Sequence, residues 1–223
     1  MCLIAEQTAV PHDNTELVRR RLPRNEREKL IVQEAIRFFA EVGFEGQTRA
    51  LAQRLGVTQP LLYRYFPDKD SLIDRVYQEA FMGSWDPEWT LALKDRSVPL
   101  RDRIVGFYQG YTKRHFEYEQ VRLFMYAGLK DPVLANRYMT FLRENLFEPL
   151  AQELKAEAGL ADDPASPEEI ECVAGLHGAV AYTGVRRWVY QADVPDDTDR
   201  VVVNIVDTYM AGILDTFRKL ADA

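Results

Sequence analysis

Polar side chains able to bind a nucleic acid cluster between residues 58 and 65. Thr58 and Gln59 open a short predicted helix, and Arg64 and Tyr65 follow on its outward side. Hydroxyl and guanidinium groups bind phosphate oxygens, whereas a glutamine carboxamide can pair with the edge of an adenine. A good bidentate contact of this kind contributes ~1–3 kcal/mol of discrimination between bases. These residue types favour contact with a nucleic acid over covalent chemistry.

Two short helices are needed to hold these side chains. Leu51, Leu55 and Leu62 are spaced so that two such helices would pack against a helix predicted over residues 25–42, and Gly56 supplies the tight turn. This arrangement is a helix-turn-helix, whose second helix enters the major groove of DNA. An αα-hairpin with a glycine turn, common in helical bundles, has the same local pattern and is an alternative at this point.

The pattern continues further and carries a specific resemblance. The segments FAEVGFEG (39–46), LAQRLGVT (51–58) and LYRYFPDKDSL (62–72) look like the three signature stretches of TetR-type (AcrR-like) transcriptional regulators, in order and without gaps. Residues 25–83 therefore resemble the DNA-binding domain of that family. The resemblance implies an all-α fold, with an N-terminal three-helix helix-turn-helix domain and a C-terminal helical domain that binds an effector and dimerises.

The resemblance also implies roles for single residues. Thr48 and Thr58 would bind phosphates or orient the recognition helix, and Lys69 matches the family's phosphate-binding lysine. The residues expected to contact double-stranded DNA are Thr48, Arg49, Thr58, Gln59, Pro60, Leu61, Tyr63, Arg64, Tyr65 and Lys69. Pro60 departs from the family, which usually has glycine there, so its added bulk should change the base preference.

The distribution of charge favours a local DNA-binding surface, although the whole chain is acidic. The 223 residues include 28 Lys and Arg against 35 Asp and Glu, a net charge of −7. Residues 17–66 nevertheless carry ten basic and five acidic side chains, whereas residues 67–223 carry a net −9. Phosphate binding needs only the local excess. The arginines between residues 19 and 24 would either follow the minor groove as an arm or form a solvated basic tail.

Nearly all of the remaining chain is predicted to be helical. Further helices are expected over residues 69–83, 100–116, 120–130, 132–158, 167–190 and 199–220, and a looser stretch containing Pro87 and Pro99 marks a boundary. The expected organisation is a flexible basic tail (1–22), a DNA-binding domain (23–83, with the helix-turn-helix at about 48–67) and a ligand-binding and dimerisation domain (84–223).

The last two predicted helices carry faces suited to pairing two subunits. Small side chains recur along the penultimate helix, and the last helix has a continuous apolar stripe. The expected interface residues are Ala174, Gly178, Ala181, Val202, Ile205, Tyr209 and Ile213. A homodimer would supply the twofold symmetry that matches a palindromic operator. A stripe buried within one subunit is the competing interpretation.

Aromatic residues crowd between positions 107 and 147 and predict a cavity for a small apolar or aromatic effector. The expected ligand contacts are Phe107, Tyr111, Tyr126, Tyr138, Phe141, His177, Tyr182 and Trp188. For any one of these residues, ordinary core packing is the competing interpretation.

Other classes of function have little support in the sequence. The histidines are scattered and Cys172 has no evident partner, so no catalytic residue, metal site or cofactor is expected. The longest run without a charged residue, 172–185, has 14 residues, short of the ~20 that a membrane span requires. The interpretation is a cytoplasmic, ligand-responsive transcriptional regulator, most simply a repressor and not an enzyme. A helical interaction protein that keeps the fold without binding an operator is the alternative.

Overall fold

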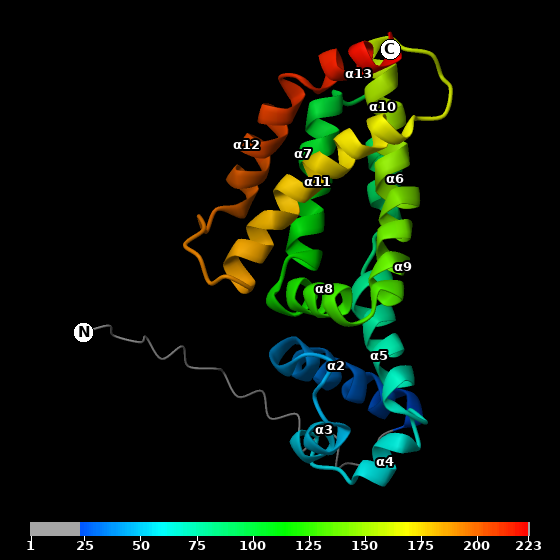
Figure 1. The fold of residues 1–223 in the computed structure, drawn as a ribbon, viewed down its shortest axis with the longest axis vertical. Helices are drawn as coiled ribbons and strands as arrows, with labels where there is room; N and C mark the ends of the chain where they lie inside the picture. The colour runs from blue at the N-terminus through cyan, green and yellow to red at the C-terminus, as the bar shows by residue number, and fades with distance from the viewer. Residues whose placement is uncertain (1–22, 223) are drawn as a thin grey trace, which may run out of the picture.

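The computed structural model describes residues 23–222, and over that range it is helical with no strand (Figure 1). The all-α prediction is therefore confirmed for this part of the chain, while the predicted tail, residues 1–22, lies outside it. The helices are α2 (Arg24–Val42), α3 (Thr48–Arg54), α4 (Gln59–Tyr63), α5 (Lys69–Tyr77), the π-helical η1 (Gln78–Met82), α6 (Pro87–Lys94), α7 (Leu100–His115), α8 (Tyr118–Lys130), α9 (Pro132–Leu142), the π-helical η2 (Arg143–Phe147), α10 (Glu148–Ala158), α11 (Pro167–Trp188), α12 (Thr198–Met210) and α13 (Ile213–Ala221). In Figure 1, α2 to α4 form a head at the lower end, and α6 to α13 form a larger body above it.

The head is built around an aromatic core. Phe39 of α2 is fully buried, and Phe38 and Phe44 meet its ring edge to face, with centroids 5.4 and 5.6 Å away. Gly43 has a φ of +78°, a conformation that glycine adopts without a steric penalty. This turn ends α2 and lets Phe44 fold back onto its last turn.

The predicted helix-turn-helix is present as α3 and α4. Leu51, Leu55 and Leu62 are almost inaccessible to solvent, and together they pack the two short helices onto α2. Gly56 has a φ of +66° in the turn between them, again a conformation that favours glycine. The core residues therefore fix the orientation of α4 relative to α2.

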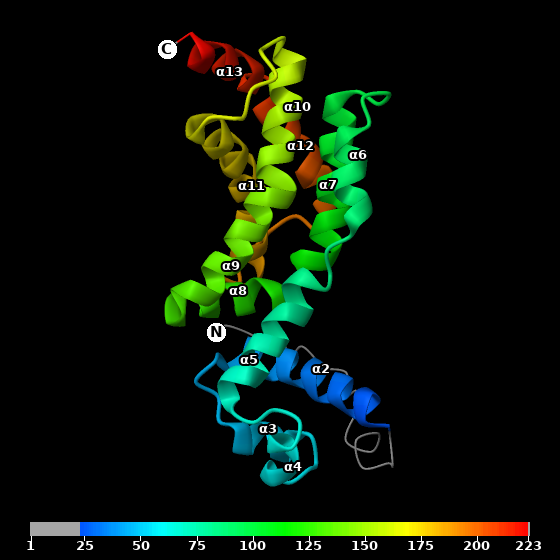
Figure 2. The ribbon, with the colours of Figure 1, turned by 90° about the vertical axis from the view of Figure 1, so that its right-hand side faces the viewer.

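A long helix joins the head to the body (Figure 2). It begins at a capping box, in which Asp68 Oδ1 accepts the Ser71 backbone N–H at 2.7 Å and Ser71 Oγ accepts the Asp68 backbone N–H at 3.3 Å. The segment η1 continues α5 with π-helical geometry and carries Phe81 into the body. The Phe81 ring lies 4.8 Å from that of Tyr138 and 6.3 Å from that of Phe124, measured between centroids.

The stretch after Gly83, expected to be irregular, contains the helix α6. Asp86 caps it, because its Oδ1 accepts the Glu88 backbone N–H at 3.1 Å, and Pro87 occupies the first turn. The expectation of a loose segment is wrong here, since a proline in the first turn starts a helix rather than ending one. Helix α6 packs on α7 and α10 as part of the body.

The single helix expected over residues 199–220 is interrupted. Helix α12 ends at Met210, and α13 begins at Ile213. The break directs Ile213 and Phe217 into the core beside α10, and Arg218 Nε donates to the Ala158 carbonyl at 3.2 Å. Helix α12 packs instead along α7. The continuous apolar stripe predicted for one helix is therefore divided between two surfaces within this chain.

Candidate nucleic-acid interface and effector cavity

The short helix α4 lies at the far end of the head (Figure 1). Leu62 faces the core, whereas Thr58, Pro60, Tyr63 and Arg64 are exposed. Pro60 lies in the first turn, where its missing backbone N–H removes no helical hydrogen bond. The outer face of α4 is therefore polar, with the bulk of a proline at its start.

Three polar side chains tie α3 to α4 at this face. Thr48 Oγ1 lies 3.0 Å from Tyr63 Oη, and Gln59 Nε2 donates to Thr48 Oγ1 at 2.9 Å and to Tyr63 Oη at 3.4 Å. Thr48 is buried, so its hydroxyl holds these partners instead of facing solvent. Of the two roles expected for Thr48, this geometry favours orienting the recognition helix. It also holds the Gln59 carboxamide in place before any DNA arrives.

Basic and aromatic side chains line a shallow groove beside α4. Arg24 lies over the ring of Tyr65 at 5.8 Å from its centroid, and Leu61 and Arg64 line the same groove. On neighbouring elements, Arg49 is exposed on α3 and Lys69 is half-buried at the first position of α5. The residues expected to contact DNA thus lie on α3, α4 and the start of α5, at one end of the molecule.

Arg54 differs from Arg49, the other basic residue of α3, because carboxylates of α2 hold it. Its Nη1 and Nη2 donate to the two carboxylate oxygens of Glu41 at 2.5 and 2.8 Å, and its Nε donates to Glu34. The hydrogen bond to Glu41 raises the pKa of Arg54 above its ordinary value, and the charge of Glu34 acts in the same direction. Since Glu34 is buried, Arg54 neutralises a carboxylate inside the head.

A largely apolar cavity of about 230 Å³ lies in the body, between η1, α7, α8, α9 and α11. Of the predicted ligand contacts, Tyr111, Tyr138 and His177 line it. Phe116, Phe124 and Phe147, which belong to the aromatic stretch 107–147, line it as well. Its wall also contains residues that sequence reasoning missed, namely Phe81, His115, Gln120, Val121, Met125, Met139, Leu142 and Val185. Gln120 and Phe124 are four residues apart on one face of α8, a spacing that the sequence does contain.

The structure places the other predicted ligand contacts outside this cavity. Phe107 stacks behind Tyr111 with ring centroids 5.5 Å apart, and Phe141 packs against Trp85 at 5.2 Å. Tyr182 is 52% exposed. Trp188 Nε1 donates to the Phe116 carbonyl at 2.8 Å. Tyr126 points toward the head, as described below.

The small residues predicted for a dimer interface keep accessible surface, because Gly178 is exposed and Ala174 and Ala181 are half-buried. Ala174, Gly178 and Ala181 of α11 line the cavity. Val202 and Ile213 are buried within this chain, while Ile205 and Tyr209 are half-buried. Tyr209 packs close to α11, since a Cβ added at Gly175 would lie 3.5 Å from its hydroxyl oxygen.

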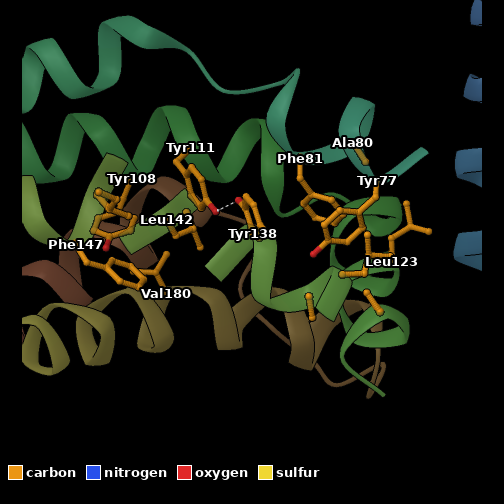
Figure 3. Close-up of a cluster of buried hydrophobic side chains, with 14 of the residues drawn as sticks. Tyr77, Ala80, Phe81, Tyr108, Tyr111, Leu123, Tyr138, Leu142, Phe147 and Val180 are labelled. Atoms are coloured by element: carbon orange, nitrogen blue, oxygen red, sulfur yellow. Dashed lines mark hydrogen bonds between the residues drawn. The ribbon is translucent and has the colours of Figure 1, made fainter. Parts of the chain in front are cut away.

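A hydrogen-bonded chain of neutral groups runs along one wall of the cavity. The hydroxyls of Tyr111 and Tyr138 share a bond of 2.5 Å (Figure 3), and Tyr138 Oη lies 3.4 Å from His115 Nδ1. Burial lowers the pKa of both His115 and His177 to about 4, and it raises the pKa of both tyrosine hydroxyls. All four side chains are therefore uncharged near neutral pH.

Arg122 of α8 connects the cavity wall to the head. Its Nε donates to the Ala40 carbonyl at 2.6 Å, and its Nη2 donates to the Glu41 carbonyl at 3.3 Å and to Tyr126 Oη at 2.7 Å. Its Nη1 donates to the Trp188 carbonyl at 3.4 Å, so the same guanidinium also reaches the end of α11. One side chain thereby joins α2, α8 and α11.

Other residues of α8 extend this contact. The Tyr126 ring packs so closely on the head that a Cβ added at Gly43 would lie 3.1 Å from it. Lys130 Nζ donates to the Phe44 carbonyl at 3.2 Å and pairs with Glu45 at 2.7 Å. Because Arg122, Tyr126 and Lys130 repeat every four residues, one face of α8 contacts the head while another lines the cavity.

A second hollow, a more polar groove of about 500 Å³, lies near the loop before α12 and is lined by charged residues such as Lys113 and Arg187. The smaller apolar cavity suits the predicted effector better. Across residues 23–222, no cluster of His, Cys, Asp or Glu has the arrangement of metal ligands. Within the same range, no helix has both the length and the apolar character to cross a membrane.

Comparison with known proteins supports the resemblance. Residues 31–76 match the family model described as bacterial regulatory proteins of the tetR family. The tetracycline repressor protein class C of Escherichia coli is 31% identical over 88 residues, which cover 36% of this chain and 40% of that protein. The class D repressor of Escherichia coli is 25% identical over 157 residues, covering 62% of this chain and 72% of that protein. This chain thus spans less than half of the first relative and nearly three quarters of the second.

Solved structures share the fold over most of the chain. A TetR-like transcriptional regulator from a Rhodococcus species superposes with a TM-score of 0.66 at 20% identity, covering 86% of this chain and 100% of that one. A tetR-family transcriptional regulator from Streptomyces coelicolor gives a TM-score of 0.61 at 16% identity, with 88% and 85% of the two chains covered. At such identities the similarity concerns the fold alone.

Proposed function

We propose that this chain, which belongs to the TetR family of bacterial regulatory proteins, controls transcription by binding operator DNA through α4. The observation that carries the proposal is the polar outer face of α4, which Thr48 and Tyr63 pre-organise around Gln59. The exposed arginines beside it suit phosphate contact. The DNA-binding domain would comprise residues 23–83, and residues 84–223 would form the effector-binding and dimerisation domain.

The regulator would act as a homodimeric repressor on a palindromic operator. Two copies paired through α11 and α12 would present two α4 helices, whose half-sites would lie ~34–36 Å apart or a multiple of that distance. Within the predicted interface, Gly178 is exposed and Ala174, Ala181, Ile205 and Tyr209 are partly exposed, so a second copy could cover them. The names of the tetracycline repressors support repression as the mode of control.

An effector in the 230 Å³ cavity would release the operator by shifting a conformational equilibrium. Two paths lead from the cavity to the head. The first path starts at Phe81, because its segment η1 directly follows α5 of the linking helix. The second starts at Gln120 and Phe124 of α8, since Arg122 of the same helix donates to the end of α2. The effector must bind one arrangement of the heads more tightly than the other, and that ratio sets how far operator occupancy moves.

A selection of operator sequences tests the role of α4 directly. The full chain and its Gln59→Ala variant would each select binding sites from random duplex DNA, with Ala50→Ser on exposed α3 surface as the control. We expect Gln59→Ala to relax the preference at an adenine in each half-site, because a bidentate contact is lost. An unchanged selected sequence would remove Gln59 from base recognition, and no binding even at low salt would favour the interaction-protein alternative.

A further inference from the structure

Two hollows of the body adjoin at one residue. The apolar cavity of about 230 Å³ and the polar groove of about 500 Å³ are both lined by Phe116, and within residues 23–222 no other residue lines both. Phe116 belongs to the short link between α7 and α8, where its backbone leaves helical geometry, with φ −112° and ψ 25°. The apolar space and the charged space are thus separated at the end of a helix.

The contacts of Phe116 fix its backbone and place its ring in the cavity wall. Its carbonyl accepts the indole N–H of Trp188 at 2.8 Å, which ties the link to α11. Its ring meets that of Tyr111 edge to face, with centroids 5.4 Å apart, and lies 6.4 Å from that of His177. Both of these neighbours line the cavity. The ring is therefore a part of the wall that can be removed without removing the backbone contact to Trp188.

The wall is thin toward α11, because a glycine lies opposite Phe116. A Cβ added at Gly184 would lie 3.5 Å from Phe116 Cβ and 3.0 Å from a methyl group of Val121. Gly184 lines the groove, whereas the next residue, Val185, lines the cavity. Since α11 has no side chain at position 184, the side chain of Phe116 supplies the bulk that separates the two hollows there.

The two hollows differ in charge. Among the described residues that line the cavity, none is Lys, Arg, Asp or Glu. The groove is lined by two basic side chains, Lys113 and Arg187, and by four carboxylates, those of Glu117, Asp196, Asp197 and Asp199. Two cations against four carboxylates leave the groove with a net charge of −2. A molecule that occupied both hollows would need an apolar part for the cavity and a polar end, preferably a cation, for the groove.

The volume of the cavity limits the size of a molecule that fits inside it alone. An apolar cavity of ~150 Å³ is enough to hold benzene. At about 230 Å³ this cavity has room for one aromatic ring and a short substituent. A longer substituent must pass the wall, and toward the groove the wall contains Phe116.

We propose that Phe116 is a specificity-determining residue, whose side chain confines the effector to the cavity and excludes molecules long enough to reach the charged groove. This inference rests on the proposed function, since the effector is the molecule that the regulator would sense. It adds the residue that limits the length of the effector. It also names the class of molecule that loss of the ring would admit, an elongated compound with an apolar ring and a cationic end.

Two neutral alcohols of different length test the limit by titration calorimetry on the full chain. The shorter is 2-phenylethanol, and the longer, 6-phenylhexan-1-ol, carries four more methylene groups. We expect the unaltered chain to bind the shorter alcohol about tenfold more tightly, because the longer one does not fit. Phe116→Ala should reverse this preference to about tenfold in favour of the longer alcohol, because the added methylene groups become buried. An unchanged preference in Phe116→Ala would overturn the inference.

The matched control is Phe124→Ala. Phe124 is half-buried like Phe116 and lines the cavity, but it does not line the groove. Its truncation enlarges the cavity without joining the two hollows, so the variant should still prefer the shorter alcohol. If Phe124→Ala admitted the longer alcohol as well as Phe116→Ala does, the limit would not belong to Phe116.

A second substitution at the same position keeps the test usable if Phe116→Ala does not fold. Phe116→Leu retains an apolar side chain of smaller size, so we expect a preference between those of the unaltered chain and the alanine variant. A leucine variant with the preference of the unaltered chain would also contradict the role of the ring.

The charge of a long probe reports where its end lies. In Phe116→Ala at low salt, we expect 6-phenylhexylammonium to bind several-fold more tightly than 6-phenylhexanoate, because the groove carries more carboxylates than cations. Equal binding of these two probes would show that the end does not reach the groove, and the inference would be wrong.

Operator binding is measured separately, so that the two proposals fail independently. If Phe116→Ala changes the ligand preference as expected but no probe alters operator occupancy, the role of Phe116 stands and the effector role in the proposed function fails. If the chain binds an operator but no probe binds the cavity, or the preference does not depend on Phe116, this inference fails and the DNA-binding proposal stands.

Discussion

The two arginines of α3 have opposite surroundings. Arg54 is held by the carboxylates of Glu34 and Glu41, whereas Arg49 is exposed next to the predicted DNA contacts. Both belong to the same seven-residue helix, and their types alone do not distinguish them. The structure therefore separates an arginine that stabilises the head from one that is available to a phosphate.

Replacing each arginine with methionine should separate the effect on stability from the effect on DNA binding. Among residues 23–222, Arg54→Met leaves the buried Glu34 carboxylate with Arg37 as its one remaining ion-pair partner, so we expect the free energy of unfolding to fall by about 1–3 kcal/mol. Arg49→Met should weaken operator binding and leave stability almost unchanged. Chemical denaturation and DNA titration of both variants would check the pair. Equal losses of stability would contradict the assignment.

The buried histidines predict how stability depends on pH. Burial lowers the pKa of His177 from 6.5 to about 4, so between these values the unfolded chain takes up a proton that the folded chain does not. The free energy of unfolding should therefore fall as the pH drops from 6.5 toward 4, by up to ~1.4 kcal/mol per pH unit for each such histidine.

The variant His177→Phe removes one of the two shifted groups and leaves His115. We expect the slope of unfolding free energy against pH between 6.5 and 5 to decrease to about half in that variant. Denaturant titrations at several pH values would measure it. A slope identical to that of the unaltered chain would show that His177 is not the group responsible.

Residue type and local spacing could not distinguish the tyrosines that line the cavity from one that contacts the head. Tyr111, Tyr126 and Tyr138 lie in helices of similar amphipathic pattern, yet only Tyr111 and Tyr138 line the cavity. Tyr126 instead bonds to Arg122 and packs on Gly43 of the head. The Tyr126–Gly43 contact joins residues far apart in the chain, so local spacing carries no information about it.

Helix α8 serves two parts of the molecule at once. One of its faces lines the cavity through Gln120 and Phe124, and another contacts the head through Arg122, Tyr126 and Lys130. Since a helix moves largely as a rigid unit, a molecule that displaces the first face also displaces the second. The proposed signal therefore has a path in addition to α5 and η1.

Removing the Arg122 guanidinium should loosen the head from the body. In Arg122→Met the carbonyls of Ala40 and Glu41 lose their donor, and we expect a loss of about 1–3 kcal/mol in unfolding free energy. Hydrogen exchange at residues 43–46 should become faster. Lys113→Met, which removes only an exposed ion pair to Asp199, is the control and should change neither quantity. Unchanged exchange at residues 43–46 would contradict this role of Arg122.

Most helices could be predicted from local signals, and the exceptions have physical causes. The capping box of Ser166 and Glu169 correctly indicates the start of α11, and the helix predicted over 132–158 is present as α9, η2 and α10. Helix α6 has the same start signal, Asp86 followed by Pro87, as α9 has in Asp131 and Pro132. The break between α12 and α13 falls at Ala211 and Gly212, and it places Phe217 in the core beside α10, a long-range contact that no local pattern contains.

The whole molecule separates a basic end from an acidic remainder. Helix α4 lies at one extremity in Figure 1, and Arg24 and Arg64 line the groove beside it. Most of the acidic excess lies beyond Phe66. Charges are screened over ~10 Å at ordinary ionic strength. The net charge of −7 should therefore have little influence on how the head meets DNA.

This separation predicts how operator affinity responds to salt. Arg64→Gln should reduce the slope of log affinity against log salt by ~0.9, the value expected for one lost phosphate contact. Glu157→Gln, which alters an exposed charge on α10, should leave the slope unchanged. Fluorescence anisotropy with labelled duplex DNA at several salt concentrations would measure both. If the two variants shifted the slope equally, net charge rather than local contact would control binding.

The placement of the tryptophans has an optical consequence. All three indoles of the chain, Trp85, Trp89 and Trp188, belong to the body. Trp85 and Trp89 pack near the Tyr111 ring at the cavity wall, and the Trp188 carbonyl accepts from Arg122 at the junction with the head. Helices α2 to α5 contain no tryptophan and therefore contribute no tryptophan fluorescence. Intrinsic tryptophan emission thus reports on the surroundings of the cavity and on the junction. In one sample, tryptophan emission can therefore follow occupancy of the cavity, while the fluorescence anisotropy of labelled duplex DNA follows occupancy of the operator.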